Sequence, residues 1–263
     1  MDKTDQPDNF REAWDHPDPK ERKGWRDSTT KEFKDMMTRK VWRIIKRKLV
    51  QKNCRLVNSK WVLHKKKDGK FRPRIVAKGF MEIPGVDFSE TFAPVVNDET
   101  FRIILILFLI YSTESEKLWM AEIWDIVSAF LYGDLDEEIY MEAPDGFERF
   151  FAFNRKLECL ILDKAIYGLV QAARQFYKKL KNALVQKLGF EKCKADPCLF
   201  YKKSELGTCI ICCYADDLAF FGYRSAVKDV VQKLQEQFDM KHVGNLEKYV
   251  RCTIDLKMGR VVK

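Results

Sequence analysis

The sequence has no apolar stretch long enough to cross a membrane. Its longest one, Ile103–Tyr111, falls well short of the roughly 20 residues that a spanning helix needs, and suits a buried helix or strand. The N-terminal segment is charged and carries prolines, without the apolar centre of a secretory signal. These absences argue against a membrane protein and a secreted protein, and they predict an intracellular one.

Histidine is scarce, and the cysteines are not arranged as metal ligands. The chain has three histidines, and its eight cysteines stand at irregular spacings. The one CxxC pair, Cys209 and Cys212, lies in an apolar strand-like run, where alternation directs the two side chains to opposite faces. A zinc site is therefore not indicated, and we expect the cysteines to be reduced, buried small hydrophobes.

Acidic residues are nearly missing from one stretch of the chain. Between Arg39 and Lys78 the only acid is Asp68, and the whole chain has a formal net charge of +9. This basic block favours a polyanionic partner, with a solvated basic face as the alternative. A hydrophobic fraction of 46% is enough for a sizeable core, so we expect one core, or two subdomains that share a cleft.

The N-terminal part of the sequence predicts an arm followed by a helix. Residues 1–24 show no periodicity and are expected to form a flexible arm. A helix should then begin at Asp27 or Ser28, either of which can cap it, and end near Arg39.

Strand-like and helical stretches follow one another in the rest of the chain. Alternating and apolar runs indicate strands, and apolar residues at a spacing of three to four indicate helices. Together they predict an α+β fold, with an antiparallel sheet backed by two helices. The predicted strands are 60–64, 74–78, 118–126, 208–213 and 218–221, and the predicted helices are 171–188 and 225–238.

Three aspartates form the candidate catalytic centre. Asp216 and Asp217 stand at the tip of the predicted hairpin, between two apolar runs. An Asp-Asp pair is most often a solvated turn, but apolar flanks on both sides indicate that these two project from a buried sheet. Asp125 ends another strand-like run, MAEIWDI, so the three carboxylates converge if the strands are neighbours.

Such a carboxylate cluster needs cations to neutralise it. Hard oxygen ligands favour two Mg²⁺ or Mn²⁺ ions, and two metals about 3.5–4 Å apart are suited to in-line phosphoryl transfer. A nucleoside triphosphate also needs protein cations. The predicted basic hairpin offers Lys65, Lys66, Lys67, Lys70, Arg72 and Arg74 for this purpose.

Several blocks of sequence resemble the reverse transcriptases of copia-type LTR retrotransposons. The run from Tyr214 to Asp217, YADD, is similar to the YxDD box, and Asp125–Phe130, DIVSAF, is similar to the upstream D-V-x-x-A-F/Y box. The blocks SKWVLHKKKDGKFRPRIVAKGF, PGVDFSETFAPVV, AFLYGDLDEEIYMEAPDGF, AIYGLVQAARQFYKKL and ADPCLF occur in the order of that family. The resemblance extends from about Trp25 to the C-terminus.

The resemblance implies a role for the three aspartates and for one backbone group. Asp125, Asp216 and Asp217 would bind both metal ions and carry the catalysis, with the backbone carbonyl of Ile126 as a further ligand.

The resemblance also implies residues that bind substrate. Phe130 would lie beneath the incoming deoxyribose and exclude a 2′-hydroxyl; the alternative is that it is an ordinary core residue. Arg74 would contact the triphosphate, with Lys66 as a second candidate, since KKK admits several alignments. Gln171 would contact the nucleotide or template, and Tyr214 would lie near the primer end or be a buried strand aromatic. Lys65, Lys67, Lys70 and Arg72 would contact nucleic acid.

Two blocks depart from the family pattern. The motif G-L-K-Q-x-P-R-x-W has Val170, Ala173 and Phe176 in place of its Lys, Pro and Trp. The Y-F/L-L-G strand that grips the primer has Arg251 and Cys252 where Leu and Gly are expected. These changes alter the residues beside Gln171 and those of the strand that would hold the primer.

The resemblance implies a right-hand polymerase fold whose thumb is largely missing. Residues 25–245 would form the fingers and palm, and the remainder would be a primer-grip and thumb stub, as in a truncated copy. The expected parts are fingers at 25–100 and 135–170, palm at 101–134 and 171–245, and the stub at 246–263.

The function implied is RNA-directed DNA polymerisation on an RNA or DNA template with a primer and dNTPs. The first alternative is a catalytically inactive remnant that only binds nucleic acid, and the second is a basic scaffold that is no polymerase. Intact relatives carry RNase H and integrase regions in the same polyprotein and work in the cytoplasm and nucleus, which would be the compartments of this chain.

Overall fold

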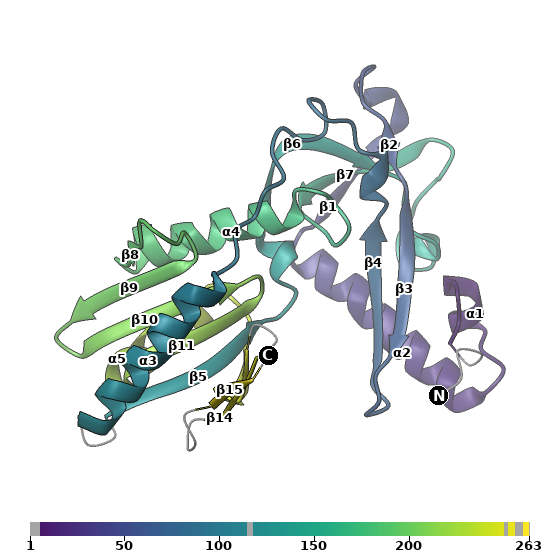
Figure 1. The fold of residues 1–263 in the computed structure, drawn as a ribbon. Coiled ribbons are helices and arrows are strands. Elements are labelled where there is room, and N and C mark those ends of the chain that lie inside the picture. Colours follow the sequence, from purple (N-terminus) through teal and green to yellow (C-terminus); the bar gives the residue numbers. More distant parts are fainter. Residues whose placement is uncertain (1–5, 115–117, 250–251, 256–259, 263) are drawn as a thin grey trace. The chain divides into compact units, whose positions relative to one another are not determined.

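The chain folds into two compact units (Figure 1). Unit 1 comprises residues up to Phe92 together with Phe130–Phe176, and unit 2 comprises Ala93–Ala129 and the chain from Tyr177 onward. Both units combine helices with mainly antiparallel sheets, which confirms the predicted α+β class. The computed structural model describes residues 6–114, 118–249, 252–255 and 260–262.

Two helices begin unit 1, α1 (Phe10–Trp14) and α2 (Pro19–Thr38). The side chain of Asp18 caps α2, because it accepts hydrogen bonds from the second and third backbone amides after it, at 2.8 and 2.9 Å. The proline at the first helical position suits this start, since its missing N–H would have no partner there. The helix therefore begins well before Asp27 and Ser28, which corrects the predicted cap.

The segment predicted as a flexible arm is helical and packed from Phe10 onward. Phe10 and Ala13 are buried, and the Phe10 ring contacts Trp14 at 5.3 Å and Trp61 at 5.5 Å between centroids. This corrects the expectation of an arm. A helix of five residues is too short to show periodicity in the sequence, and its stability comes from these tertiary contacts.

The predicted basic hairpin is present in unit 1 as β3 (Ser59–Lys65) and β4 (Phe71–Ala77). A second sheet, in the order β1-β7-β6-β2, stands beside a buried core that is rich in aromatic rings. The strands of this sheet are β1 (Trp42–Lys46), β2 (Leu56–Val57), β6 (Asp134–Met141) and β7 (Glu158–Lys164). Short 3₁₀ segments also occur in this part of the chain, namely η2 (Arg47–Leu49), η3 (Gly79–Met81), η4 (Ala129–Tyr132) and η5 (Phe147–Arg149).

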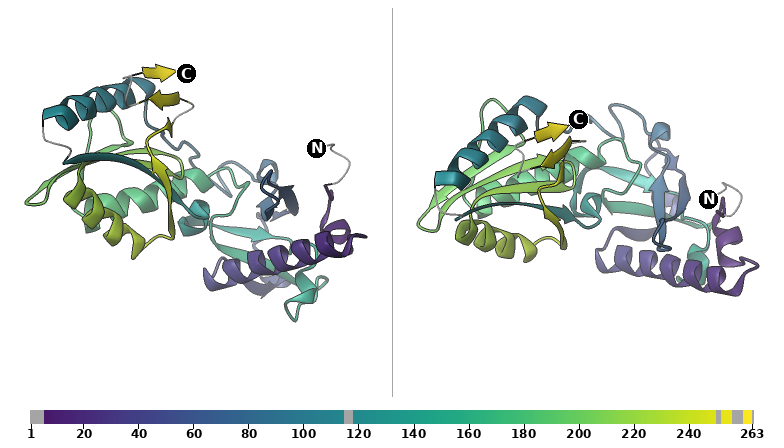
Figure 2. Two further views of the ribbon diagram at one scale, coloured as in Figure 1. Left: turned by 90° about the horizontal axis from the view of Figure 1, so that it is seen from below. Right: turned by 60° about the horizontal axis from the view of Figure 1, so that its bottom comes forward.

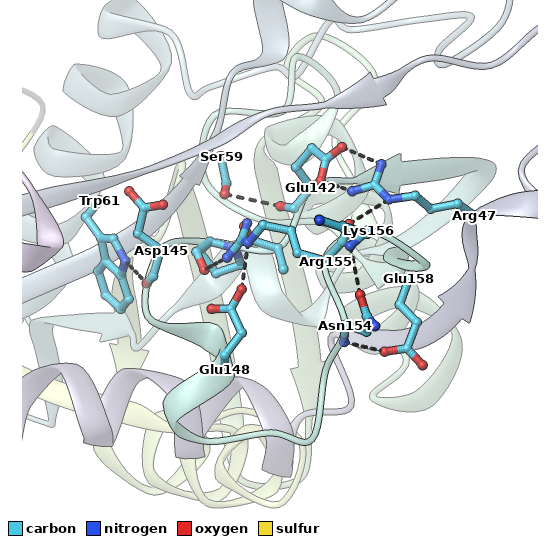
Figure 3. Close-up of polar contacts among 12 residues, drawn as sticks. Arg47, Ser59, Trp61, Glu142, Asp145, Glu148, Asn154, Arg155, Lys156 and Glu158 are labelled. Atoms are coloured by element: carbon cyan, nitrogen blue, oxygen red, sulfur yellow. Dashed lines mark hydrogen bonds and ion pairs between the residues drawn. The ribbon is translucent and has the colours of Figure 1, made fainter.

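A polar network holds the loop between β6 and β7 (Figure 3). Arg47 donates to Glu142 at 2.6 Å and to the backbone oxygen of Arg155 at 2.9 Å. Arg155 in turn donates to Glu148 at 2.6 Å, and the indole of Trp61 donates to the Asp145 backbone oxygen at 2.9 Å. Charge-assisted bonds of this kind fix a loop that has little regular structure of its own.

Unit 2 is built on a six-stranded sheet in the order β12-β5-β11-β10-β9-β8. Figure 2 shows α3 (Asp98–Glu114) on one face of this sheet and α5 (Arg224–Gln235) on the other. The strands are β5 (Trp119–Ile126), β8 (Glu191–Lys192), β9 (Leu199–Ser204), β10 (Gly207–Tyr214), β11 (Asp217–Tyr223) and β12 (Met240–Asn245), and a further small sheet has β13 (Lys248–Tyr249), β14 (Cys252–Asp255) and β15 (Arg260–Val262).

The predicted helices of unit 2 are present with altered ends. The helix expected at 171–188 is α4 (Ala172–Asn182) continued by a π-helical turn, η6 (Ala183–Lys187), and the boundary between the units falls inside α4. The helix from Ser225 is α5 (Arg224–Gln235).

The apolar stretch Ile103–Tyr111, for which both helix and strand were open, lies in the helix α3 (Asp98–Glu114). Ile104 and Phe108 are buried, whereas Ile106 is 57% exposed, so the stretch is buried on one side only. No helix in the described part of the chain is long and apolar enough to cross a membrane.

The cysteines that the structure describes are free, and most of them are buried, as predicted. Of the departures noted in the predicted primer-grip strand, Arg251 lies outside the described residues, and so does its neighbour Val250.

Candidate active site

The hairpin of β10 and β11 carries two of the three predicted aspartates. Tyr214 pairs with Asp217 at the end of the two strands, and Ala215 and Asp216 form the tip. Ala215 adopts a positive φ of 52°, which the tight two-residue turn requires. Below the tip, Leu218 and the residues that follow it in β11 are buried, so the carboxylates project from the end of a buried sheet.

Asp125 lies directly beside this tip. β5 is antiparallel to β11, and in their register Asp125 is opposite Asp217. The backbone amide of Ile126 donates to the backbone oxygen of Asp216 at 3.0 Å, which ties the two segments together. Residues directly opposite each other in antiparallel strands project to the same face. The carboxylates of Asp125 and Asp217, far apart in sequence, therefore lie on one face of the sheet, where the two neighbouring strands meet the hairpin tip.

The three carboxylates also interact electrostatically. Burial raises the pKa of Asp217 to about 6, and the negative charges of Asp216 and Asp125 add to this rise. A carboxylate next to two others resists ionisation unless a cation or a proton compensates the charge.

The arrangement of donors bears on which ion could bind here. Carboxylate oxygens are the ligands that Mg²⁺ and Mn²⁺ prefer. Within the described residues, no three His, Cys, Asp or Glu side chains are gathered closely enough to hold a metal ion. Asp125, Asp216 and Asp217 are thus neighbours with oxygen ligands of the right kind, but their side chains are not gathered around one point.

Lys241 lies in the same cross-strand row, although no motif in the sequence indicated it. β12 pairs with β5 on the side away from β11, and Lys241 is opposite Asp125 in that register. The row across three strands is therefore Asp217, Asp125, Lys241, with all three side chains on one face. The exposed ammonium of Lys241 adds a positive charge beside the acidic pair.

Tyr249 supports the hairpin from below and was not singled out by the sequence. Its hydroxyl donates to the backbone oxygen of Cys212 at 2.7 Å and approaches that of Asp217 at 3.2 Å, and it is buried. Its ring contacts that of the half-buried Tyr214, with centroids 6.4 Å apart. Tyr249 is the first residue of the predicted primer-grip motif, which is the signal that could have identified it.

In unit 1, two predicted substrate residues contact one aromatic ring. The guanidinium of Arg74 lies 4.6 Å from the centroid of the Tyr167 ring, and the ring of Phe130 makes an edge contact with Tyr167 at 5.1 Å. Arg74 and Phe130 are both half-buried, so each keeps an accessible edge. Tyr167 links them, and no sequence pattern indicated a role for it beyond membership of the AIYGL block.

Gln171 is buried rather than presented to a ligand. It is 1% exposed, and its amide nitrogen donates to the backbone oxygen of Asp87 at 3.1 Å within unit 1. This environment is that of an internal polar residue. A direct contact between Gln171 and a nucleotide stays a prediction, and the burial of the Gln171 side chain does not support it.

The lysines of the hairpin have different surroundings. Lys65 forms an ion pair with Glu21 of α2, and its ammonium lies 5.1 Å from the Phe71 ring centroid. Lys70 pairs with Asp68 at 3.3 Å in the exposed turn. The other predicted cations of this hairpin include Lys66, Lys67 and Arg72, which are exposed.

Comparisons with known proteins identify the family. A model of the family described as reverse transcriptase (RNA-dependent DNA polymerase) matches residues 39–261. The Pol polyprotein of transposon TNT 1-94 from Nicotiana tabacum is 34% identical over 91% of this chain. The Ty1-NL1 Gag-Pol polyprotein from Saccharomyces cerevisiae is 28% identical over 86% of it. The predicted resemblance to copia-type elements is confirmed.

These relatives are much longer than this chain, which spans 17% of the tobacco protein and 12% of the yeast protein. Among solved structures, a foamy viral protease-reverse transcriptase in complex with double-stranded DNA is 13% identical, with a TM-score of 0.42, over 88% of this chain and 34% of that one. The family match covers most of the sequence, and the chain therefore belongs to the reverse transcriptase (RNA-dependent DNA polymerase) family.

Proposed function

We propose that this chain is the RNA-directed DNA polymerase domain of a copia-type element, which transfers a nucleotidyl group from a dNTP to a primer 3′-hydroxyl. The observation that carries the proposal is the register of β5 and β11, which brings Asp125 opposite Asp217 and beside Asp216. A nucleotidyl transfer centre needs such a carboxylate group on a rigid support, because the geometry of in-line displacement tolerates little movement.

In this proposal Asp125, Asp216 and Asp217 hold two Mg²⁺ or Mn²⁺ ions, with the carbonyl of Ile126 as a further ligand. The ions would lower the pKa of the 3′-hydroxyl and neutralise the pyrophosphate that leaves. The chain contributes the placement of the carboxylates. The mutual repulsion that raises the pKa of Asp217 supports this reading, because it is relieved when cations bind.

Arg74, Tyr167 and Phe130 form the proposed nucleotide-binding group of unit 1. The Tyr167 ring limits the rotation of the Arg74 guanidinium that lies over it, which prepares that fork for a triphosphate. Phe130 contacts the same ring, so it is held as a flat wall suited to exclude a ribose 2′-hydroxyl. In the terms of the family, unit 1 corresponds to fingers and unit 2 to palm.

Exposed cations of the β3–β4 hairpin would contact the template or primer backbone. Lys66, Lys67 and Arg72 are exposed and free to reach phosphates, and Lys70 has only an exposed ion pair to give up. Lys65 is the weakest member of the predicted set, because its half-buried ion pair with Glu21 would have to open first.

The test is extension of a DNA primer on an RNA template with dNTPs and Mg²⁺ or Mn²⁺. We expect incorporation by the unaltered chain and a loss of about a hundred-fold or more in Asp216→Asn, by analogy with the removal of one group that stabilises the transition state. Asp27→Asn, an exposed change of the same type in α2, should leave the rate unchanged.

Two results would contradict the proposal. Incorporation that survives Asp216→Asn would separate the activity from these carboxylates. No incorporation by the unaltered chain, together with salt-sensitive binding of the primer and template, would instead support the inactive remnant that only binds nucleic acid.

A further inference from the structure

Unit 1 contains a cluster of buried oxygens that have no hydrogen-bond partner. Among the described residues, five buried side-chain polar atoms lack one, and three of the five are Oε2 of Glu82, Oδ1 of Asp87 and Oε1 of Gln171. The residues are 7%, 0% and 1% exposed. Buried acceptors without partners are rare in folded proteins because each costs desolvation energy. Three of them on residues that are linked through Gln171, which bonds to the Asp87 backbone and to the Glu82 side chain, need a physical explanation.

Backbone hydrogen bonds hold each group by its other polar atom. The amide of Val170 donates to Oε1 of Glu82 at 3.0 Å, and the amide of Ile83 donates to Oδ2 of Asp87 at 2.7 Å. The side-chain nitrogen of Gln171 donates to the backbone oxygen of Asp87 at 3.1 Å. Each side chain is thus fixed in orientation, with one oxygen left over.

The backbone around the cluster is closely packed. A Cβ added at Gly79 would lie 2.1 Å from the backbone oxygen of Gly168 and 2.9 Å from Oε1 of Glu82. Gly168 has a φ of +90°, and a Cβ there would lie 2.1 Å from the backbone oxygen of Ala77. The two glycines let the segments that carry Glu82 and Gln171 approach each other. The positions of the three side chains are therefore set by the packed backbone.

The cluster contains two carboxyl groups and no ion-pair partner among the described residues. None of the ion pairs between described residues involves Glu82 or Asp87. Burial raises the pKa of Glu82, hydrogen bonds from Val170 and Gln171 oppose this, and the charge of Asp87 adds to the rise. A buried carboxylate pair of this kind requires a proton, a water molecule or a cation.

We propose that Glu82, Asp87 and Gln171 bind a divalent cation in unit 1, separate from the carboxylates of the candidate active site. Two carboxylates and one amide oxygen are a ligand set typical of Ca²⁺ and Mg²⁺ sites, with water completing the shell. One cation satisfies all three oxygens and the charge together, whereas one water molecule donates to only two of them, and one proton satisfies fewer still. The proposal does not depend on polymerase activity.

The bound ion gives Gln171 a role that its burial otherwise leaves unexplained. The Gly168–Gln171 turn leads directly into α4, and its end would be fastened to the 82–87 segment through the ion. The cation would therefore position the start of α4 in unit 1.

The test is made in a chain with Asp125→Asn, Asp216→Asn and Asp217→Asn, so that ions at the candidate active site cannot contribute. We expect Ca²⁺ or Mg²⁺ to raise the Tm of this triple variant by roughly 2–6 °C, on the scale of a tight ligand for a domain of this size. Calorimetric titration with Ca²⁺ should show one site.

Asp87→Asn is the informative further change in that background. The asparagine oxygen can still accept from Ile83, while its NH₂ group can donate to Glu82 or Gln171. We expect the metal-free Tm to hold or rise, and the shift caused by the ion and the calorimetric site to disappear. Glu82→Gln should act in the same way, and Asp27→Asn, an exposed change in α2, should keep both.

The proposal is overturned if the triple variant shows neither a Tm shift nor a calorimetric site with Ca²⁺ or Mg²⁺. The three oxygens would then be satisfied by a proton or by water. It is also overturned if Asp87→Asn and Glu82→Gln fold and keep the full shift. Loss of primer extension in the triple variant has no bearing on this outcome, so the two proposals fail independently.

Discussion

The two units assemble their candidate sites in different ways. In unit 2 the backbone does it, since the register of three antiparallel strands puts Asp217, Asp125 and Lys241 in one row. In unit 1 side chains do it, since Arg74 and Phe130 both contact the Tyr167 ring. A site fixed by strand register depends on few contacts, whereas one fixed by side-chain packing depends on the core beneath it.

The cores differ accordingly. Unit 1 packs rings against rings, and Phe33 alone contacts the rings of Trp61, Phe147, Phe150 and Phe151. In unit 2 the hairpin beneath the aspartates is hydrogen-bonded along its length, and its buried residues are cysteines, aliphatic residues and two phenylalanines. Removing a buried aromatic ring from unit 1 should therefore lower its unfolding free energy more than removing a polar contact lowers that of unit 2. The predictions below test this contrast.

The largest effect is expected from Phe33→Ala. Removing this buried ring leaves a cavity among four others, and such changes cost about 3–5 kcal/mol of unfolding free energy. Urea unfolding followed by hydrogen exchange should show faster exchange in β3 and β4, with β10 and β11 unchanged. Phe80→Ala removes a ring that is 84% exposed and serves as the control. Equal loss of protection in both units would contradict the separation of their cores.

Arg74→Ala is expected to act on substrate binding. It removes the fork that Tyr167 holds, and we expect the KM for dNTP to rise about 10–100-fold, which corresponds to about 1.4–2.7 kcal/mol. Arg74→Lys should recover little, because an ammonium lacks the planar fork. Arg72→Ala removes the same charge two residues away, and steady-state kinetics should show a small change in KM for it. Similar KM values for the two alanine variants would assign Arg74 to general electrostatics.

The contrast also explains what the sequence could predict. The strand that ends at Asp125 was expected beside the hairpin of Asp216 and Asp217, and the register of β5 and β11 shows that the two strands are neighbours. Strands with apolar flanks have few ways to pair, and the motif residues are at their ends. The hairpin β3–β4 was predicted for the same local reasons, namely alternation and an Asp-Gly turn. Where local pattern fixes geometry, the sequence was sufficient.

Other features depend on contacts between segments far apart in sequence. The burial of Phe10 comes from docking on Trp61, which no local pattern reports. Gln171 was assigned to substrate, but its packing against Asp87 makes it an internal group. Tyr167 and Lys241 acquire their neighbours only in the folded sheet and core. These are tertiary effects, and a single sequence carries no direct signal for them.

A smaller effect is expected from Tyr249→Phe, which tests the support of the hairpin in unit 2. The change leaves the backbone oxygen of Cys212 without this donor, at a cost of about 1–2 kcal/mol. Chemical unfolding should show the loss, with kcat for primer extension falling while the KM for dNTP stays near its original value. Tyr201→Phe removes an exposed hydroxyl contact with Glu191 and should cost less. No loss of stability would mean that strand pairing alone holds the tip.

The smallest effect concerns the charge of Asp217 in metal-free buffer. Its pKa is about 6 in the folded chain against an ordinary value of 3.8, so between these values the folded state holds a proton that the unfolded state releases. The free energy of unfolding should therefore fall as the pH rises from about 4 to 6 and then level off. Asp217→Asn should remove this fall and stabilise the chain at pH 7.5, by on the order of 1 kcal/mol once solvent screening is allowed for. Urea unfolding at pH 4.5 and 7.5 measures it, with Asp27→Asn as the exposed control. A fall that persists in Asp217→Asn would place the responsible proton on another group, and the carboxylate row of unit 2 would then be less strained than its register implies.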